Sequence, residues 1–149
     1  MQLNPLEKLI GSGFYTGYIP FASGTFGSIA GLLIYYIPGF EKPFIIIPAI
    51  ILFTVYGFFV GSKFEKVYVK DPSECTVDEV VGMWISLLFI PKIWWLSLIV
   101  FFLWRISDII KPYPARKLEK LEGGLGIMID DIISSIYVLL VVHLFILTL

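Results

Sequence analysis

Five carboxylates stand at the edges of long apolar runs, where charged side chains are rare. They are Asp78, Glu79, Asp108, Asp130 and Asp131. An ionised carboxylate beside hydrocarbon is costly unless it is paired, hydrated or bound to a metal. Because they come from three separate stretches of the chain, we expect them to converge on one site. A hard divalent cation, which prefers oxygen ligands, is the simplest occupant.

Two basic residues flank one of these acids. Arg105, Asp108 and Lys111 follow one another at intervals of three, which places them along one side of a helix. Taken alone, this pattern favours a local ion pair in which the long basic side chains reach toward water. Beside metal-bound carboxylates, the same two cations would instead hold a phosphate, Arg105 through its bidentate guanidinium. Both interpretations stay open at this point.

Small residues occur in two further stretches that can contact an anion. Gly124 and Gly126 come shortly before Asp130 and Asp131, and a helix beginning there offers backbone N–H groups to a phosphate. Thr25 lies in the Ser- and Gly-rich residues 23–28, where small side chains also serve close helix packing. We predict phosphate contacts from Thr25, Gly124 and Gly126, with helix packing as the competing interpretation for residues 23–28.

Other hydrolytic chemistries find little support. His143 is the only histidine and lies deep in the last apolar run, which disfavours a mechanism using paired histidines. Cys75 is the only cysteine, so no internal disulfide can form, and no Arg follows it at the spacing of a cysteine phosphatase loop. The net charge of −1 suggests no nucleic-acid partner. A metal-activated water remains the best-supported nucleophile.

The composition predicts a membrane protein. Hydrophobic residues make up 58% of the 149-residue chain and charged residues 15%, well below the roughly 25% of soluble domains. The mean hydropathy is +0.89. Residues 43–62 and 132–149 carry no charge, and the first of these meets the roughly 20-residue length of a membrane span. We therefore expect one domain, residues 1–149, folded as an all-α, polytopic membrane bundle.

About four or five apolar helices are expected. The apolar segments are residues 26–37, 43–62, 80–90, 93–104 and 132–149. The third and fourth are short and are separated by Pro91, so they form two short helices with polar extensions, a re-entrant hairpin or one kinked helix. Lysines and arginines favour the cytoplasmic side. A hairpin would put the basic stretches and the acids on that side together, and we prefer it.

Two local features are also predicted next to these segments. Asp71 followed by Pro72 is typical of a helix N-terminus, so we expect Asp71 to cap the third helix. Residues 114–122 combine leucines with Arg116, Lys117 and Lys120, which indicates a short helix at the membrane surface or a solvated connection.

Four motifs together resemble the phosphatidylglycerophosphatase A family. They are residues 20–28, 71–82, 105–114 and 123–131, in the family's order, and they cover nearly the whole chain from about residue 11. The departures are Ser23, where the family usually has Pro, and Cys75, where it has an aliphatic residue. The resemblance implies a multi-pass enzyme of the bacterial inner membrane, with its active site facing the cytoplasm. It also implies hydrolysis of phosphatidylglycerophosphate to phosphatidylglycerol and phosphate with Mg²⁺.

The predicted site combines the acids with the cations and small residues. Catalytic roles are assigned to Asp78, Glu79, Asp108 and Asp131, metal binding to Asp78, Glu79, Asp130 and Asp131, and phosphate binding to Arg105, Lys111, Thr25, Gly124 and Gly126. Besides the phospholipid substrate and the bilayer no partner is implied, and the oligomeric state stays open. The alternatives are another metal-dependent lipid-phosphate transferase, a small cation transporter and a scaffold for lipid enzymes.

Overall fold

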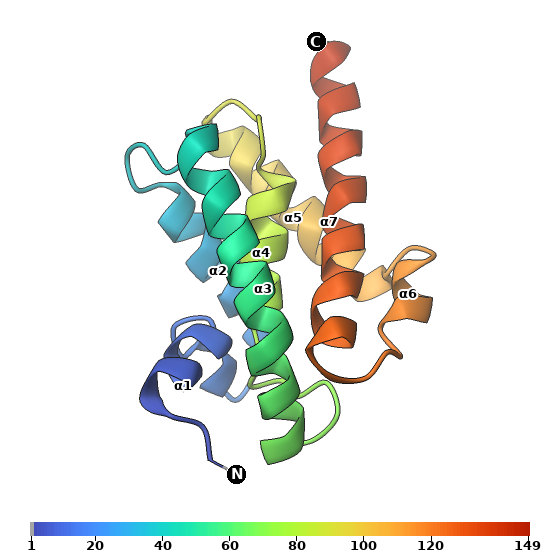
Figure 1. Ribbon diagram of the computed structural model, residues 1–149. Coiled ribbons are helices and arrows are strands. Elements are labelled where there is room, and N and C mark those ends of the chain that lie inside the picture. Colours follow the sequence, from blue (N-terminus) through green and yellow to red (C-terminus); the bar gives the residue numbers. More distant parts are fainter. Residues whose placement is uncertain (1) are drawn as a thin grey trace.

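The chain is all-helical, as predicted. The computed structural model describes residues 2–149, and these form α-helices and one short 3-10 helix without any strand. The elements are α1 (Pro5–Gly11), η1 (Thr16–Tyr18), α2 (Ser23–Tyr35), α3 (Pro43–Val67), α4 (Val77–Ser86), α5 (Trp94–Ile110), α6 (Ala115–Leu118) and α7 (Gly123–Leu147). Figure 1 shows α3 and α7 as the two long helices, with the chain termini at opposite ends of the molecule.

Two helices, α3 and α7, are long and apolar enough to cross a membrane, judged by length and composition. The expected number of four or five such helices is therefore too high for the described residues. At 1.5 Å per residue, the 13 residues of α2 reach about 20 Å and the 10 of α4 about 15 Å, short of the roughly 30 Å hydrocarbon core. Of the shorter apolar helices, α4 is buried inside the bundle, whereas α2 and α5 each keep an exposed apolar side.

Helices α3 and α7 run antiparallel and touch through glycines. A Cβ atom added at Gly61 would lie 2.9 Å from the Cα of Gly124, and one added at Gly57 would lie 2.6 Å from the sulfur of Met128. Glycine lets two helix backbones approach this closely because it has no side chain. The contact fixes the first turns of α7, which carry two of the acids, beside the last turns of α3.

Helix α4 lies inside the bundle, against α2, α3, α5 and α7. Its Trp84 is buried and donates a hydrogen bond from Nε1 to the carbonyl of Gly31 in α2, at 2.9 Å. Trp104 of α5 is also buried and donates to Ser28 Oγ of α2 at 2.9 Å. Buried indoles with satisfied N–H groups make large contacts in fixed orientations. These two residues orient α4 and α5 about α2.

Residues 80–104 form two helices rather than one kinked helix. α4 ends at Ser86 and α5 begins at Trp94, and Phe89 between them has a left-handed backbone with φ of 58°. Figure 1 shows α5 returning from the end of the molecule at which α4 finishes. The there-and-back path brings the start of α4 and the end of α5 to the same end of the bundle.

Two local predictions need correction. Asp71 does not cap α4, which begins at Val77 after Thr76. Residues 71–76 form a loop instead, because the Thr76 backbone N–H donates to the carbonyl of Gly11 at 2.9 Å and its hydroxyl donates to the carbonyl of Ser12 at 2.7 Å. The helix expected over residues 114–122 is limited to α6, Ala115–Leu118.

Candidate active site

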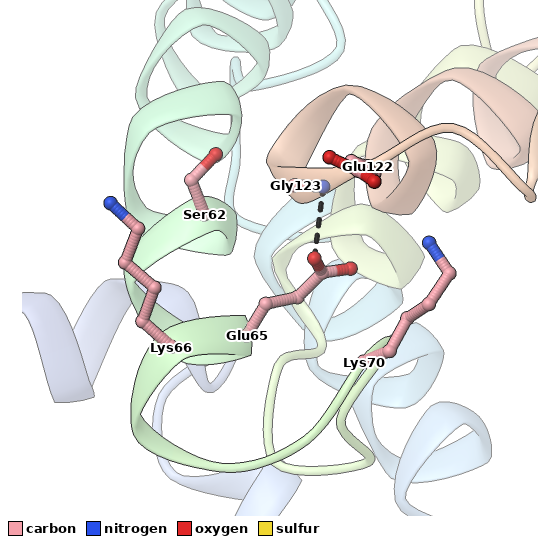
Figure 2. A pocket seen from close by; sticks show the side chains of 6 residues that line it. All are labelled: Ser62, Glu65, Lys66, Lys70, Glu122 and Gly123. Carbon is pink, nitrogen blue, oxygen red and sulfur yellow. Dashed lines mark hydrogen bonds between the residues drawn. The ribbon is translucent and has the colours of Figure 1, made fainter.

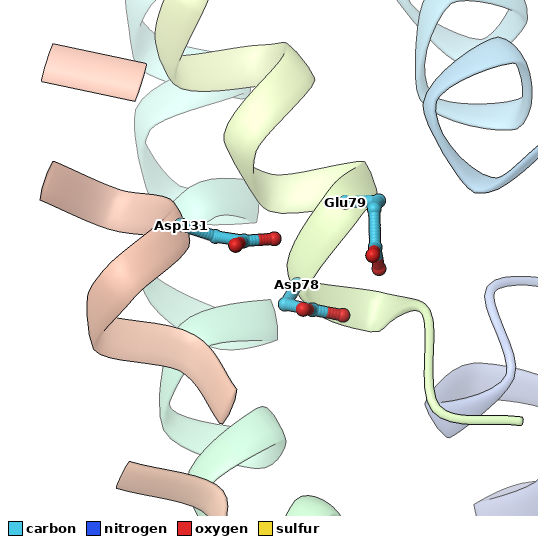
Figure 3. A group of neighbouring side chains, drawn as sticks. All are labelled: Asp78, Glu79 and Asp131. Carbon is cyan, nitrogen blue, oxygen red and sulfur yellow. The ribbon is translucent and has the colours of Figure 1, made fainter. Parts of the chain in front are cut away.

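Three of the predicted carboxylates meet between α4 and α7. Asp78 and Glu79 lie in the first turn of α4, and Asp131 lies in the third turn of α7. Each offers one oxygen, and these oxygens all lie within 4.8 Å of one another. Figure 3 shows Asp131 pointing from α7 toward the two acids of α4. Asp131 is 1% exposed and Asp78 6%, so the group is shielded from solvent.

Each of the three acids keeps one buried oxygen without a hydrogen-bond partner. These atoms are Asp78 Oδ1, Glu79 Oε2 and Asp131 Oδ2. Burial raises the pKa of Asp78 well above its usual range, with further increases from Glu79 and Asp131, and burial raises the pKa of Glu79 to about 7. Unpaired buried carboxylates are costly. An all-oxygen set of this kind fits a hard divalent cation such as Mg²⁺.

The two predicted cations join the same cluster from the end of α5. Arg105 NH1 lies 2.5 Å from Asp108 Oδ2, and Lys111 Nζ lies 3.3 Å from Asp108 Oδ1. Both oxygens of Asp108 are thus engaged by cations. The local ion pair expected from the spacing is present, and Asp108 serves to hold the two basic groups.

Lys111 also links α5 to the paired acids of α7. Its Nζ lies 2.6 Å from Asp130 Oδ2 and 3.4 Å from Asp131 Oδ1. Burial alone would lower the pKa of Lys111, but the carboxylates of Asp131, Asp108 and Asp130 raise it above its usual range, so the amine stays protonated. Asp130, predicted as a metal ligand, lies outside the group of three and faces Lys111 instead.

The first turn of α2 approaches Arg105 and Glu79 closely. A Cβ atom added at Gly24 would lie 3.0 Å from Glu79 Oε1 and 3.1 Å from Arg105 NH2. Arg105 Nε is buried without a hydrogen-bond partner. Thr25 follows Gly24 in the first turn of α2 and is half-buried. The sequence indicated phosphate contact or close helix packing for residues 23–28 as a whole, and the close approach at Gly24 agrees with helix packing.

The amides of the first two glycines of α7 are bonded to side chains of α3. The Gly124 N–H donates to Ser62 Oγ at 2.8 Å, and Gly126 is buried against the carbonyl of Leu121. Figure 2 shows the neighbouring Gly123 N–H bonded to Glu65, at 2.9 Å. The Gly124 amide is therefore engaged within the protein, and the phosphate contact of Gly126 stays a prediction. The close approach of Gly124 to the Phe58 carbonyl of α3 gives it a role in helix packing.

Ser62 and Glu65 help to position the start of α7, a role that the sequence did not indicate. They lie in the last turns of α3, and besides bonding the start of α7 they border a surface cavity of about 500 Å³ away from the three acids. Glu65 also accepts from the Asp71 N–H at 3.2 Å. In the sequence Glu65 stands among lysines and resembles a solvated charge. Its role depends on an antiparallel contact that the sequence does not display.

Comparison with known proteins identifies relatives over most of the chain. The family profile of Phosphatidylglycerophosphatase A matches residues 9–146. A protein of Bacteroides thetaiotaomicron, provisionally named a phosphatidylinositol-3-phosphatase, is 39% identical over 140 residues, 89% of this chain and 88% of that protein. Proteins named phosphatidylglycerophosphatase A are 38% identical over 147 residues in Haemophilus influenzae (94% of this chain, 88% of that protein) and 33% over 131 in Escherichia coli (86% and 76%). Among solved structures, none matches significantly. The chain therefore belongs to the phosphatidylglycerophosphatase A family, a family of phosphatases, as its motifs predicted.

Proposed function

We propose that this chain is a Mg²⁺-dependent lipid phosphatase that hydrolyses phosphatidylglycerophosphate to phosphatidylglycerol and phosphate at the cytoplasmic face of the bacterial inner membrane. The observation that carries the proposal is the group formed by Asp78, Glu79 and Asp131, with three unpaired buried oxygens and two cations beside it. A scaffold or a simple structural ion pair does not require three carboxylates to converge within 4.8 Å of one another.

Asp78, Glu79 and Asp131 would hold the metal. A bound Mg²⁺ would lower the pKa of a water and polarise a phosphoryl oxygen. Asp130 is 2.6 Å from Lys111 and is assigned to orienting that amine rather than to the metal. The same assignment applies to Asp108, whose oxygens are both occupied by Arg105 and Lys111.

The cations and the start of α2 would bind the phosphate. Arg105 can donate from its unpaired Nε while NH1 stays on Asp108. Such charge-assisted bonds from a planar guanidinium orient a phosphoryl group as well as attracting it. Gly24, where a Cβ would crowd Glu79 Oε1 and Arg105 NH2, lets the first turn of α2 approach this guanidinium, and Thr25 follows it in the same turn. Lys111 stays protonated and offsets the negative charge that the phosphate adds.

The transport alternative finds less support in the geometry. All five carboxylates and both cations gather at one end of the bundle, around the start of α4, the end of α5 and the start of α7. A cation pathway requires ionisable groups along a route through the membrane. The described parts of α3 and α7 beyond this cluster are apolar.

The test is phosphate release by purified protein in detergent micelles, with Mg²⁺ or with a chelator. We expect release from phosphatidylglycerophosphate that requires Mg²⁺ and falls by at least about 100-fold in Asp131→Asn, since loss of even an outer partner of a metal costs 10–100-fold. Glu122→Gln, an exposed acid outside the group, serves as the control. Well-folded protein that releases no phosphate with any divalent metal would overturn the proposal.

Phosphatidylinositol 3-phosphate belongs in the same assay, because one relative is provisionally named for that substrate. Both lipids present a phosphomonoester to the same cations and acids. A higher kcat/KM on the inositol lipid would change the assigned head group and leave the assigned site intact. We expect phosphatidylglycerophosphate to be the better substrate.

A further inference from the structure

An apolar groove runs along the bundle between α5 and α7. It encloses about 230 Å³ between Leu103, Ile106 and Ile110 of α5 and Tyr137, Val138 and Val141 of α7. The two hydroxyls in its walls are already satisfied: Ser107 Oγ donates to the Ser134 carbonyl at 3.1 Å, and the Tyr137 hydroxyl donates to the Tyr113 carbonyl at 2.6 Å. The groove therefore offers an occupant apolar contact and no free polar partner.

The groove starts where the carboxylate cluster ends. Asp130, Ser134, Val138 and Val141 follow one another at intervals of four, four and three, so they lie along one face of α7. At 1.5 Å per residue, Val138 stands about 12 Å along the axis from Asp130. On α5 the groove residue Ile110 directly precedes Lys111. The length of about 12 Å between Asp130 and Val138 can hold a polar head group, with its phosphate at Lys111 and its acyl chain at Val138.

The open side of the groove is itself apolar. Ile106 is 52% exposed and Val141 54% exposed, although Val138 at the floor is only 4% exposed. Helix α7 is one of the two helices able to cross a membrane, so these side chains lie on a surface suited to hydrocarbon. An occupant that is apolar, narrow and linked to a phosphate would match both the groove and the cluster next to it.

We infer that this groove binds one acyl chain of the phospholipid whose terminal phosphate occupies the carboxylate cluster. The inference rests on the proposed function, because it takes its phosphate anchor from that site. Other bilayer lipids carry the same kind of chain and are the competing occupants. If the groove holds the substrate's own chain and not that of another lipid, a mutant side chain that fills the groove must weaken substrate binding.

The groove is expected to act on binding rather than on the chemical step. We expect the groove to contribute uniform binding, equal in the ground state and the transition state, so its loss raises KM and leaves kcat nearly unchanged. The effect must also disappear for a substrate with chains too short to reach Val138. A purely structural role would change both substrates alike.

The experiment compares Val141→Trp, which fills the groove, with Leu140→Trp as a matched control. Leu140 is the preceding residue of α7 and is 56% exposed, but it does not line the groove. Dioleoyl and dihexanoyl phosphatidylglycerophosphate are the substrates, in micelles of one detergent. We expect Val141→Trp to raise KM for the dioleoyl substrate about 10-fold, in the range set by apolar pockets, and to change the dihexanoyl KM less than about 2-fold. Leu140→Trp should match wild type on both.

Equal effects of Val141→Trp on the two substrates, or equal effects of the two variants, would overturn the inference. A second measurement keeps it separable from the proposed function. Phosphatidylglycerol carrying a photoreactive diazirine on one acyl chain is irradiated with wild-type protein, and the labelled peptides are mapped. Labelling concentrated on residues 103–112 and 137–141 supports the groove even if no phosphate is released. Labelling spread equally over exposed α3 residues such as Leu52 and Phe59 would overturn the inference even if the enzyme is active.

Discussion

Asp130 and Asp131 are adjacent in sequence and do different work in the structure. Successive residues of a helix point about 100° apart, so only Asp131 faces the acids of α4, and Asp130 faces Lys111. Sequence reasoning assigned both to the metal because it could not set the rotation of α7. The pairing of Arg105 with Asp108, in contrast, follows from spacing alone and was predicted.

A metal held by Asp131 should stabilise the protein as well as activate it. Mg²⁺ at about 100 times its dissociation constant stabilises a folded protein by about 2.7 kcal/mol, so thermal unfolding in detergent should shift upward by several degrees. We expect this shift in wild type and in Glu122→Gln, and its loss in Asp131→Asn. An equal upward shift in Asp131→Asn would exclude Asp131 as a ligand, whatever the activity measurements show.

Arg105 is expected to need its planar guanidinium and not only its charge. Lysine cannot hold Asp108 and a phosphate at once through a fixed fork, so Arg105→Lys should lower kcat/KM by about 10- to 100-fold. The comparison is Arg116→Lys, an exposed arginine whose NH2 donates to the Ile110 carbonyl. If kcat/KM falls by the same small factor in both variants, Arg105 acts only through its charge.

Among the elements, the contact between α3 and α7 decides where the acids of α7 stand. Gly124→Ala places a Cβ against the Phe58 carbonyl, and such overpacking costs about 1–3 kcal/mol. We expect the temperature of unfolding to fall by about 2–10 °C. Leu52→Ala, on the exposed face of α3, is the control and should change it little. An unchanged temperature of unfolding in Gly124→Ala would mean that α3 and α7 can move apart without loss of stability.

The elements also show where sequence patterns fail. Asp71 and Pro72 match a helix start, but the backbone of Thr76 bonds to Gly11 and the helix begins later. The partner of Thr76 lies more than sixty positions away along the chain, so no local pattern reveals it. Helix α3 was predicted with nearly correct bounds because long uncharged runs have few other structures available to them, whereas α7 begins at Gly123, well before the expected start at residue 132.

The whole molecule has an uneven distribution of basic residues. Lys70 donates to the carbonyl of Leu121 at 3.1 Å, which places the polar stretches after α3 and before α7 at one end, with the site. At the other end stand Lys42 and Lys92, and Lys92 is paired with Glu41 at 2.9 Å. The hydrogen bond from Lys92 lowers the pKa of Glu41, so the pair stays ionised at neutral pH. Because basic residues are more frequent at the end of the molecule that carries the site, we expect that end to face the cytoplasm.

Cysteine labelling in intact cells tests this orientation. Thr148→Cys at the far end should react with a membrane-impermeant maleimide, and Lys120→Cys at the site end should react only after the membrane is opened. Cys75 is buried, so the unaltered chain is its own control and should stay unlabelled. Labelling of Lys120→Cys in sealed cells would place the site outside.

Helix α7 carries Asp131 in its third turn and an exposed apolar side over the rest of its length. An enzyme built this way meets its substrate by lateral diffusion, in two dimensions. Its rate should follow the mole fraction of substrate in the surface, not the amount per litre. Adding inert detergent at constant total substrate should therefore slow turnover, as surface dilution separates enzyme from lipid without changing either one.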